Sequence, residues 1–290
     1  MKGTVIGAIL AWSTFSACAS GGAKANADDR PVSVLPPDNA PPPPADGMPA
    51  GFGVAFAATD SRARAALFQI QCAATVPRLR ASGSFGPAAS APRNVYCERN
   101  ADGVPLAGVF EIDTGFTRVR RLIMIRLDGT RPRYTDAVDT MRVAQVAKLA
   151  RDISREVAPA WRRLSRSFTV VSLPQADGTI EGWVIPRSAR TGREVLGGDV
   201  AYVRASGGRV QRTVDRATSW REIVVPKTGA VGLKSAERDV AAVADLVAAR
   251  SLAERGRDVT VTTASARSVL VAGLDPSGSR FHWEHARLTP

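Results

Sequence analysis

The two histidines of this chain, His282 and His285, lie near its C-terminus with Trp283 and Glu284 between them. Positions three apart share one face of a helix but point to opposite faces of a strand. The neighbouring Phe281 and Trp283 favour a strand, which separates the two imidazoles. A mononuclear metal site needs a further ligand from elsewhere in the chain, and no pattern supplies one. We therefore expect neither a metal nor another cofactor.

Motifs for the common catalytic mechanisms are missing from the sequence. There is no G-x-S-x-G nucleophile elbow, no C-x-x-C pair and no G-x-G-x-x-G dinucleotide loop. The turn at 196–199 (LGGD) does not fit a phosphate loop, because no Lys-Ser/Thr pair follows its glycines. We assign no catalytic residue. A pair of carboxylates acting as acid and base leaves no linear signature, so hydrolysis through such a pair remains an alternative.

The N-terminus has the pattern of an export signal. A cationic start at Met1-Lys2-Gly3 precedes an apolar run over 4–15 that is too short to span a bilayer. The following Phe15-Ser16-Ala17-Cys18 resembles the lipobox of bacterial lipoproteins, with Phe15 where that family prefers leucine. The resemblance implies a signal peptide over 1–19, lipidation of Cys18 and a periplasmic protein anchored to a bacterial membrane. The alternative is cleavage after Ala17-Cys18-Ala19 and secretion without a lipid.

Residues 20–50 have the composition of a disordered linker. Eight prolines lie between Arg30 and Gly51, and four of them are consecutive, at 41–44. Such a segment cannot bury a core and favours extended polyproline conformations. We therefore predict a tether between the lipid and a folded domain over 51–290.

The remaining cysteines, Cys72 and Cys97, form an even set once Cys18 is lipidated or removed. Cysteines in an oxidising compartment usually pair. The sequence therefore predicts a Cys72–Cys97 disulfide, with two separate buried thiols as the alternative.

The formal net charge is +12, and arginine carries most of it because the chain has only five lysines. A positive surface attracts anionic headgroups and polymers. Arg118, Arg120 and Arg126 share one face of a predicted strand and form the candidate anion-binding row. No dense basic run interleaved with aromatic residues occurs, so no nucleic-acid partner is expected. The expected partners are the membrane, through the lipid, and an envelope protein or an anionic polymer.

The hydrophobic periodicity predicts an α+β fold. A helix over 135–164 has one apolar stripe, with Thr135 or Asp136 as its cap and a stop or kink near Pro159. A second amphipathic helix has Ser235 as its cap and ends before Gly256. Strands are predicted by β-rich runs at 95–99, 104–112, 117–127, 168–173, 179–185, 199–205, 209–214, 221–225, 259–263, 268–272 and 279–284. The period over 51–74 does not decide between strand and helix.

These elements predict antiparallel sheet with two helices packed on it, in one domain or in two lobes at 51–134 and 135–290. Trp183 and Trp220 are expected in the core, unless a pocket gathers them with the arginine row. The functional prediction is an exported, lipid-anchored envelope protein with a non-enzymatic binding or structural role. The alternative is a periplasmic hydrolase of cell-wall or glycan bonds that uses two carboxylates.

Overall fold

The computed structural model of the 290-residue chain describes residues 51–81, 94–99, 104–127, 133–135, 139–163, 167–175, 177–204, 210–275 and 278–288. The predicted signal peptide, with Cys18, and the predicted tether over 20–50 lie outside these residues.

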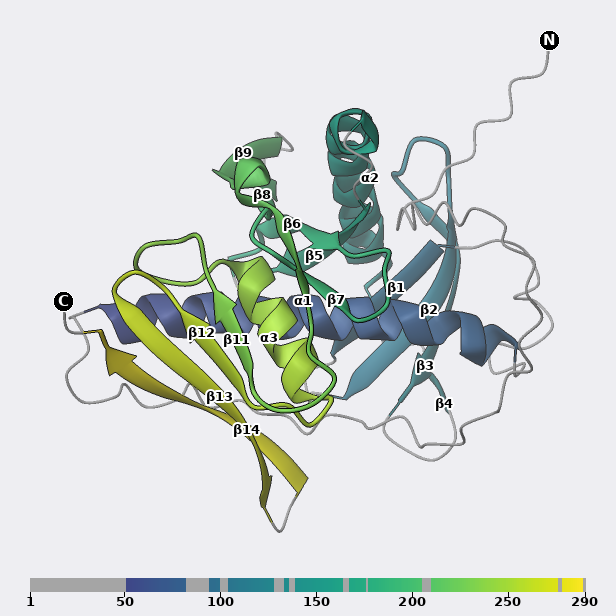
Figure 1. Ribbon diagram of the computed structural model, residues 1–290. Coiled ribbons are helices and arrows are strands. Elements are labelled where there is room, and N and C mark those ends of the chain that lie inside the picture. Colours follow the sequence, from purple (N-terminus) through teal and green to yellow (C-terminus); the bar gives the residue numbers. More distant parts are fainter. Residues whose placement is uncertain are drawn as a thin grey trace, which may run out of the picture.

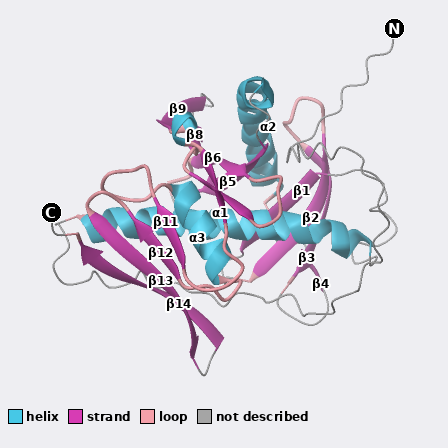
Figure 2. Ribbon diagram, viewed as in Figure 1, coloured by secondary structure: helices cyan, strands magenta, loops and turns pink. Residues whose placement is uncertain are grey.

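The described residues form a mixed α+β fold with three α-helices (Figure 2). The helices are α1 (Phe52–Ala81), α2 (Thr140–Arg163) and α3 (Val243–Ala253). The strands are β1 (Asn94–Arg99), β2 (Pro105–Ile112), β3 (Val119–Arg126), β4 (Arg133–Thr135), β5 (Ser167–Pro174), β6 (Ile180–Arg187), β7 (Arg193–Leu196), β8 (Val200–Arg204), β9 (Val210–Asp215), β10 (Arg221–Val224), β11 (Val231–Lys234), β12 (Val259–Thr262), β13 (Ala266–Asp275) and β14 (Gly278–Arg287). The prediction of α+β with antiparallel sheet is confirmed, and the prediction of two helices is wrong because α1 is a third.

Three four-stranded sheets and one two-stranded ribbon are present in the described part of the chain. Sheet 1 has the order β1-β2-β3-β4, sheet 2 the order β5-β6-β8-β9, and sheet 3 the order β11-β12-β13-β14, while β7 pairs with β10. All strand pairings in the described residues are antiparallel except β11 with β12, which are parallel. Helix α3 connects these two strands, as a parallel pair requires.

Helix α1 is the element that the other parts share. Figure 1 shows it running from the side of sheet 3 to the side of sheet 1, and it contacts α3, β5, β1 and β2. Its buried positions recur every three or four residues: Phe52, Phe56, Asp60, Ala63, Leu67 and Ile70. The buried stripe includes a charge, and the opposite side carries Val54 and several alanines. The hydrophobic contrast that identifies a helix in sequence is therefore absent.

Helices α1 and α2 cover opposite faces of sheets 1 and 2. On sheet 1, Ile125 packs with α1 residues such as Val76, while its neighbour Met124 packs with Val143 of α2. On sheet 2, α2 covers one face, and the other face shares a core with α1, α3 and sheet 3. Strand β3 is thus covered on both faces where Met124 and Ile125 are buried, whereas Arg120 near the hairpin is exposed.

The edge strands of sheets 1 and 2, β1 and β5, meet at a small cavity of about 30 Å3. The cavity is lined by Gln69 of α1, by Ala147 and Ala150 of α2, and by residues of both strands. The Gln69 side-chain amide donates to the backbone oxygen of Ser172 at 2.5 Å and accepts from its backbone nitrogen at 3.0 Å. Gln69 thus satisfies edge groups of β5 that a neighbouring strand would otherwise bind.

Helix α2 begins later than predicted. Asp139 Oδ1 accepts from the backbone nitrogens of Met141 at 2.9 Å and Arg142 at 3.2 Å, so Asp139 is the cap. Thr135 belongs to β4 instead. The helix continues through Pro159 to Arg163. Of the predicted stop or kink near Pro159, the stop is therefore wrong.

A buried ion pair joins α1 to α3. Arg250 donates from Nε to Asp60 Oδ1 at 2.7 Å and from Nη2 to Asp60 Oδ2 at 2.5 Å. The two side chains are 6% and 1% exposed. Charges this deeply buried are tolerated only when paired and hydrogen-bonded, so the pair fixes how the two helices pack.

The Sγ atoms of Cys72 and Cys97 lie 2.09 Å apart, at disulfide bonding distance. This agrees with the predicted pairing. The bond joins α1 to the first strand of sheet 1 and lies in the core between them.

We expect Cys72→Ser/Cys97→Ser to lower the free energy of unfolding by about 3 kcal/mol, because the unfolded chain gains the entropy of an open loop. Urea unfolding measures this loss. A reductant should reproduce the loss in the wild type and leave the double variant unchanged. Equal stability of the oxidised wild type and the double variant would contradict the prediction.

Replacement of Asp60 tests the buried ion pair. We expect Asp60→Asn, which keeps the side-chain shape, to lower the free energy of unfolding by about 3–5 kcal/mol, because Arg250 stays buried without its counter-charge. Asp239→Asn makes the same change at an exposed position, where surface substitutions usually alter stability by less than about 0.5 kcal/mol. Similar losses in the two variants would show that the pair does not hold the helices together.

Candidate functional site

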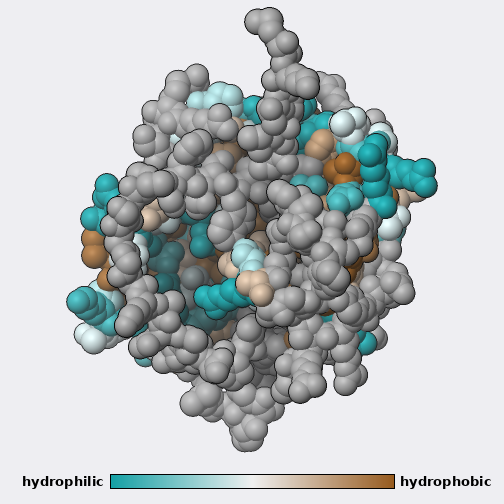
Figure 3. Space-filling model, turned by 90° about the vertical axis from the view of Figure 1, so that its right-hand side faces the viewer, coloured by the Kyte–Doolittle hydropathy of each residue, from teal (hydrophilic) through white to brown (hydrophobic). Residues whose placement is uncertain are grey.

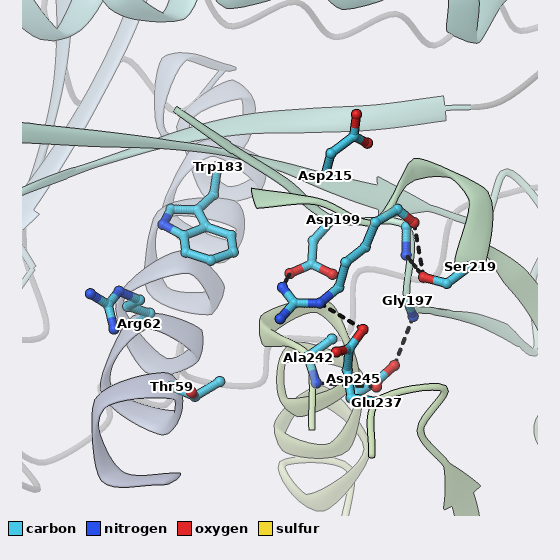
Figure 4. A network of polar contacts seen from close by, with 12 residues as sticks. Thr59, Arg62, Trp183, Gly197, Asp199, Asp215, Ser219, Glu237, Ala242 and Asp245 are labelled. Carbon is cyan, nitrogen blue, oxygen red and sulfur yellow. Dashed lines mark hydrogen bonds and ion pairs between the residues drawn. The ribbon is translucent and has the colours of Figure 1, made fainter. Parts of the chain in front are cut away.

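Two buried carboxylates whose pKa is raised by burial, Asp199 and Asp245, belong to one polar cluster (Figure 4). Asp199 follows the Gly197-Gly198 turn between β7 and β8, and Asp245 lies in the first turn of α3. Both residues are almost completely buried, at 0% and 1% exposure. Carboxylates in such a setting are the first candidates for acid–base chemistry.

Asp245 is held by three donors. Its Oδ1 accepts from the backbone nitrogen of Gly197 at 2.7 Å, and its Oδ2 accepts from Ser235 Oγ at 2.5 Å and from the Ala242 nitrogen at 3.4 Å. The last bond closes the N-terminus of α3, whose cap is Ala242 and not the predicted Ser235. Burial raises the pKa of Asp245, while these hydrogen bonds act to lower it.

Asp199 has one charged partner. Arg216 Nη1 donates to Asp199 Oδ2 at 3.3 Å, and Arg216 Nε lies 2.7 Å from Glu237 Oε1. Asp199 Oδ1 has no hydrogen-bond partner among the described residues. Burial raises the pKa of Asp199 to about 6, against the opposing effect of Arg216.

The Gly197-Gly198 turn packs against the segment 217–220. Both glycines have positive φ, +62° and +76°, a conformation that other residues rarely adopt. A Cβ at Gly197 would lie 2.6 Å from the Ser219 carbonyl oxygen. Ser219 also accepts from the Gly198 nitrogen at 3.2 Å. The turn is therefore packed against Ser219 and leaves no room there for a larger residue.

This arrangement fits a structural role better than catalysis. A hydrolase needs two carboxylates that reach the scissile bond and water. Asp199 and Asp245 are fully buried, and Asp245 is bonded to the backbone that surrounds it. Figure 4 shows the cluster connecting the turn before β8 with the segment that leads into α3. The cluster thus ties sheet 2 to α3.

A serine–histidine pair is also present, but its geometry is not that of a hydrolase. Ser268 Oγ lies 2.7 Å from His285 Nδ1, and the imidazole packs 4.3 Å from the Phe56 ring of α1. In serine hydrolases the nucleophile bonds to Nε2 and faces the substrate. Here Ser268 is buried, and the acidic Asp60 nearby is committed to Arg250. Burial lowers the pKa of His285.

His282 and His285 lie on opposite faces of β14, as the strand interpretation predicts: His282 is exposed and His285 is half-buried. Within the residues that the structure describes, no group of three or more His, Cys, Asp or Glu side chains is placed to hold a metal ion.

The structure divides the predicted arginine row. Arg118 and Arg120 are exposed at the β2–β3 hairpin. Arg126 lies at the other end of β3 and is only partly exposed, and the buried Met124 lies between it and the hairpin. A bulge opposite Glu111 and Ile112 further shifts the register near Arg120. Only two members of the row therefore share one surface, which the sequence pattern did not indicate because it contains no sign of the bulge.

The tryptophans do not form a ligand face with these arginines. Trp183 is 5% exposed and donates from Nε1 to Glu181 at 3.0 Å, and Trp220 packs at the edge of the core between α2 and sheet 2. Figure 3 shows the side of the molecule that carries sheet 1. Among the described residues visible there, both hydrophobic and hydrophilic ones reach the surface.

Asp199 and Asp245 were not singled out from the sequence. An aspartate directly after a Gly-Gly turn, and another three residues after a helix cap, are the signals that could have identified them. Each is weak alone, because only the fold brings the two segments together.

Comparison of the chain with protein-family models, with curated proteins and with solved structures found no match. None of the helices in the described part of the chain has the length and apolar character needed to span a membrane.

Asp199 makes stability depend on pH. Its folded pKa of about 6 exceeds the ordinary value of 3.8, so between these values the folded state binds the proton more tightly than the unfolded state does. The contribution to stability is therefore complete below pH 4 and is lost as pH rises to about 6. A shift of roughly two units corresponds to about 3 kcal/mol at most.

We expect Asp199→Asn, which cannot titrate, to remove this fall in the free energy of unfolding between pH 4 and 6. Urea unfolding at several pH values in this range measures it, with the exposed Asp258→Asn as the matched control. Parallel pH curves for wild type and Asp199→Asn would contradict the assigned pKa.

Proposed function

We propose that this chain is an exported, lipid-anchored protein of the bacterial cell envelope with a non-enzymatic binding or structural role. Cys18 carries the lipid, residues 20–50 are the tether, and the α+β fold is the working part on the periplasmic side of the membrane.

The Cys72–Cys97 pair is the observation that carries this proposal. Two cysteines from distant segments lie at disulfide bonding distance inside a core. Structural disulfides persist in oxidising compartments and are rare in the cytosol. Together with the apolar leader and the lipobox-like Cys18, the pair supports export.

The absence of accessible chemistry in the described residues supports a binding or structural role. Asp199 and Asp245 are buried within the fold, and so is Ser268. Nothing in the geometry favours the alternative of a carboxylate-pair hydrolase.

Metabolic labelling tests the anchor. The full chain is produced in a bacterial host fed with an alkyne analogue of palmitate. We expect the wild type to take the label and to sediment with membranes, and Cys18→Ala to lose the label, because Cys18 alone provides the lipidated thiol. The control is Cys72→Ser/Cys97→Ser, which should keep the label.

An unlabelled wild type that remains in the cytosol with free thiols at Cys72 and Cys97 would contradict the proposal. An unlabelled but exported chain would favour secretion without a lipid.

A further inference from the structure

One side of α2 carries exposed cations together with an exposed apolar side chain. Met141, Lys148 and Arg155 recur at intervals of seven residues, so they lie along one stripe of the helix. Met141 is 69% exposed, which is unusual for a large hydrophobic residue. Arg155 is exposed and Lys148 partly so. The opposite side of the helix is buried against sheets 1 and 2.

The β2–β3 hairpin adds two cations beside this stripe. The Arg151 guanidinium lies 4.0 Å from the centroid of the Phe116 ring, so the hairpin is packed against the middle of α2. Phe116 has a φ of 58°, a strained conformation held by the turn around it. Arg118 and Arg120 follow this turn, and both are exposed.

Three acidic side chains near this surface are hydrogen-bonded or paired within the fold. Asp113 accepts from the Thr117 hydroxyl at 2.6 Å and from the Thr117 and Arg118 nitrogens. On α2, Asp152 pairs with Arg204 at 2.8 Å, and Glu156 pairs with Arg212.

The exposed cations are different. In the described part of the chain, no ion pair involves Arg118, Arg120, Lys148 or Arg155, although the Arg120 charge acts on the Asp113 carboxylate and helps to lower its pKa. These four residues are called the basic surface below. The charges of Arg118, Lys148 and Arg155 are therefore available to an external anion, and Arg120 adds a charge that it shares with Asp113.

The exposed Met141 helps to distinguish two kinds of anionic partner, a soluble polyanion and a lipid bilayer. A soluble polyanion gains nothing from an apolar side chain. A bilayer offers headgroup charge and an apolar interior together, and peripheral proteins use both. Each cation near an anionic bilayer contributes about 1 kcal/mol.

We propose that the basic surface and Met141 form a peripheral docking site for an anionic lipid bilayer. The site rests on the proposed function, which holds the chain at a membrane through its lipid. Docking would lay α2 along the headgroups and turn sheet 3, at the far end of α1, away from them.

The experiment uses the full chain with Cys18→Ala, so that no lipid contributes. Binding is measured by flotation with vesicles of phosphatidylcholine containing roughly one-third phosphatidylglycerol, and with phosphatidylcholine alone, at about 0.1 M salt. We expect binding to the anionic vesicles only. Arg118→Glu/Arg155→Glu should weaken it at least tenfold, given about 1 kcal/mol for each cation lost.

The matched control is Arg267→Glu/Arg287→Glu, which makes the same change in net charge at exposed positions of sheet 3. It should weaken binding less than about twofold, since these residues lie outside the docking site. Met141→Ala should weaken vesicle binding several-fold and leave binding of inorganic polyphosphate unchanged. All variants keep the same leader, so any contribution from it cancels.

Equal losses of vesicle binding in the two double variants would contradict the proposed site and indicate a general effect of net charge. Binding to neutral vesicles at the same strength would overturn it in favour of the leader. Tight polyphosphate binding without vesicle binding would identify a soluble polyanion instead. Because no variant carries a lipid, these results are independent of the palmitate experiment, and either proposal can fail without the other.

Discussion

The burial of α1 on several sides is the constraint on which the rest of the described structure depends. One helix supplies core residues to sheet 1, to sheet 2 and to α3 with sheet 3. A helix in that position cannot slide or rotate without exposing apolar area. Asp60 makes the constraint stricter, because its bidentate bond to Arg250 is possible at one register only. The disulfide at Cys72 fixes the same helix near its other end.

The polar clusters of the interior complete this arrangement. Gln69 binds the edge of β5 where a strand is missing, and Asp245 binds both the Gly197 turn and the start of α3. In each case a buried side chain satisfies backbone groups that neighbouring strands or helices leave open. The strongly perturbed pKa values of Asp199 and Asp245 follow from this burial. The raised pKa of these carboxylates reflects their burial in the interior. The same burial keeps them from the substrate and water that catalysis requires.

The outer surface is where an external partner can act. The interior carboxylates are bonded within the fold, whereas Arg118, Lys148 and Arg155 form no ion pair in the described part of the chain. A protein held at a membrane by a lipid, as proposed here, would meet that surface at high effective concentration. Weak electrostatic contacts then become sufficient to orient it. The proposed anchor and the proposed docking site would therefore reinforce each other physically.

The sequence by itself determined the features that depend on residues close together in the chain. Alternating patterns identified most strands, the apolar stripe identified α2, and the cysteine count identified the Cys72–Cys97 pair. Only the tertiary structure decided features that join distant segments. It showed α1 as a helix, since its inner stripe contains Asp60 and small residues whose burial depends on α3 and sheet 3. It also separated Arg126 from Arg118 and brought Asp199 towards Asp245, because strand register and helix packing are set by contacts between parts of the chain that the local pattern does not contain.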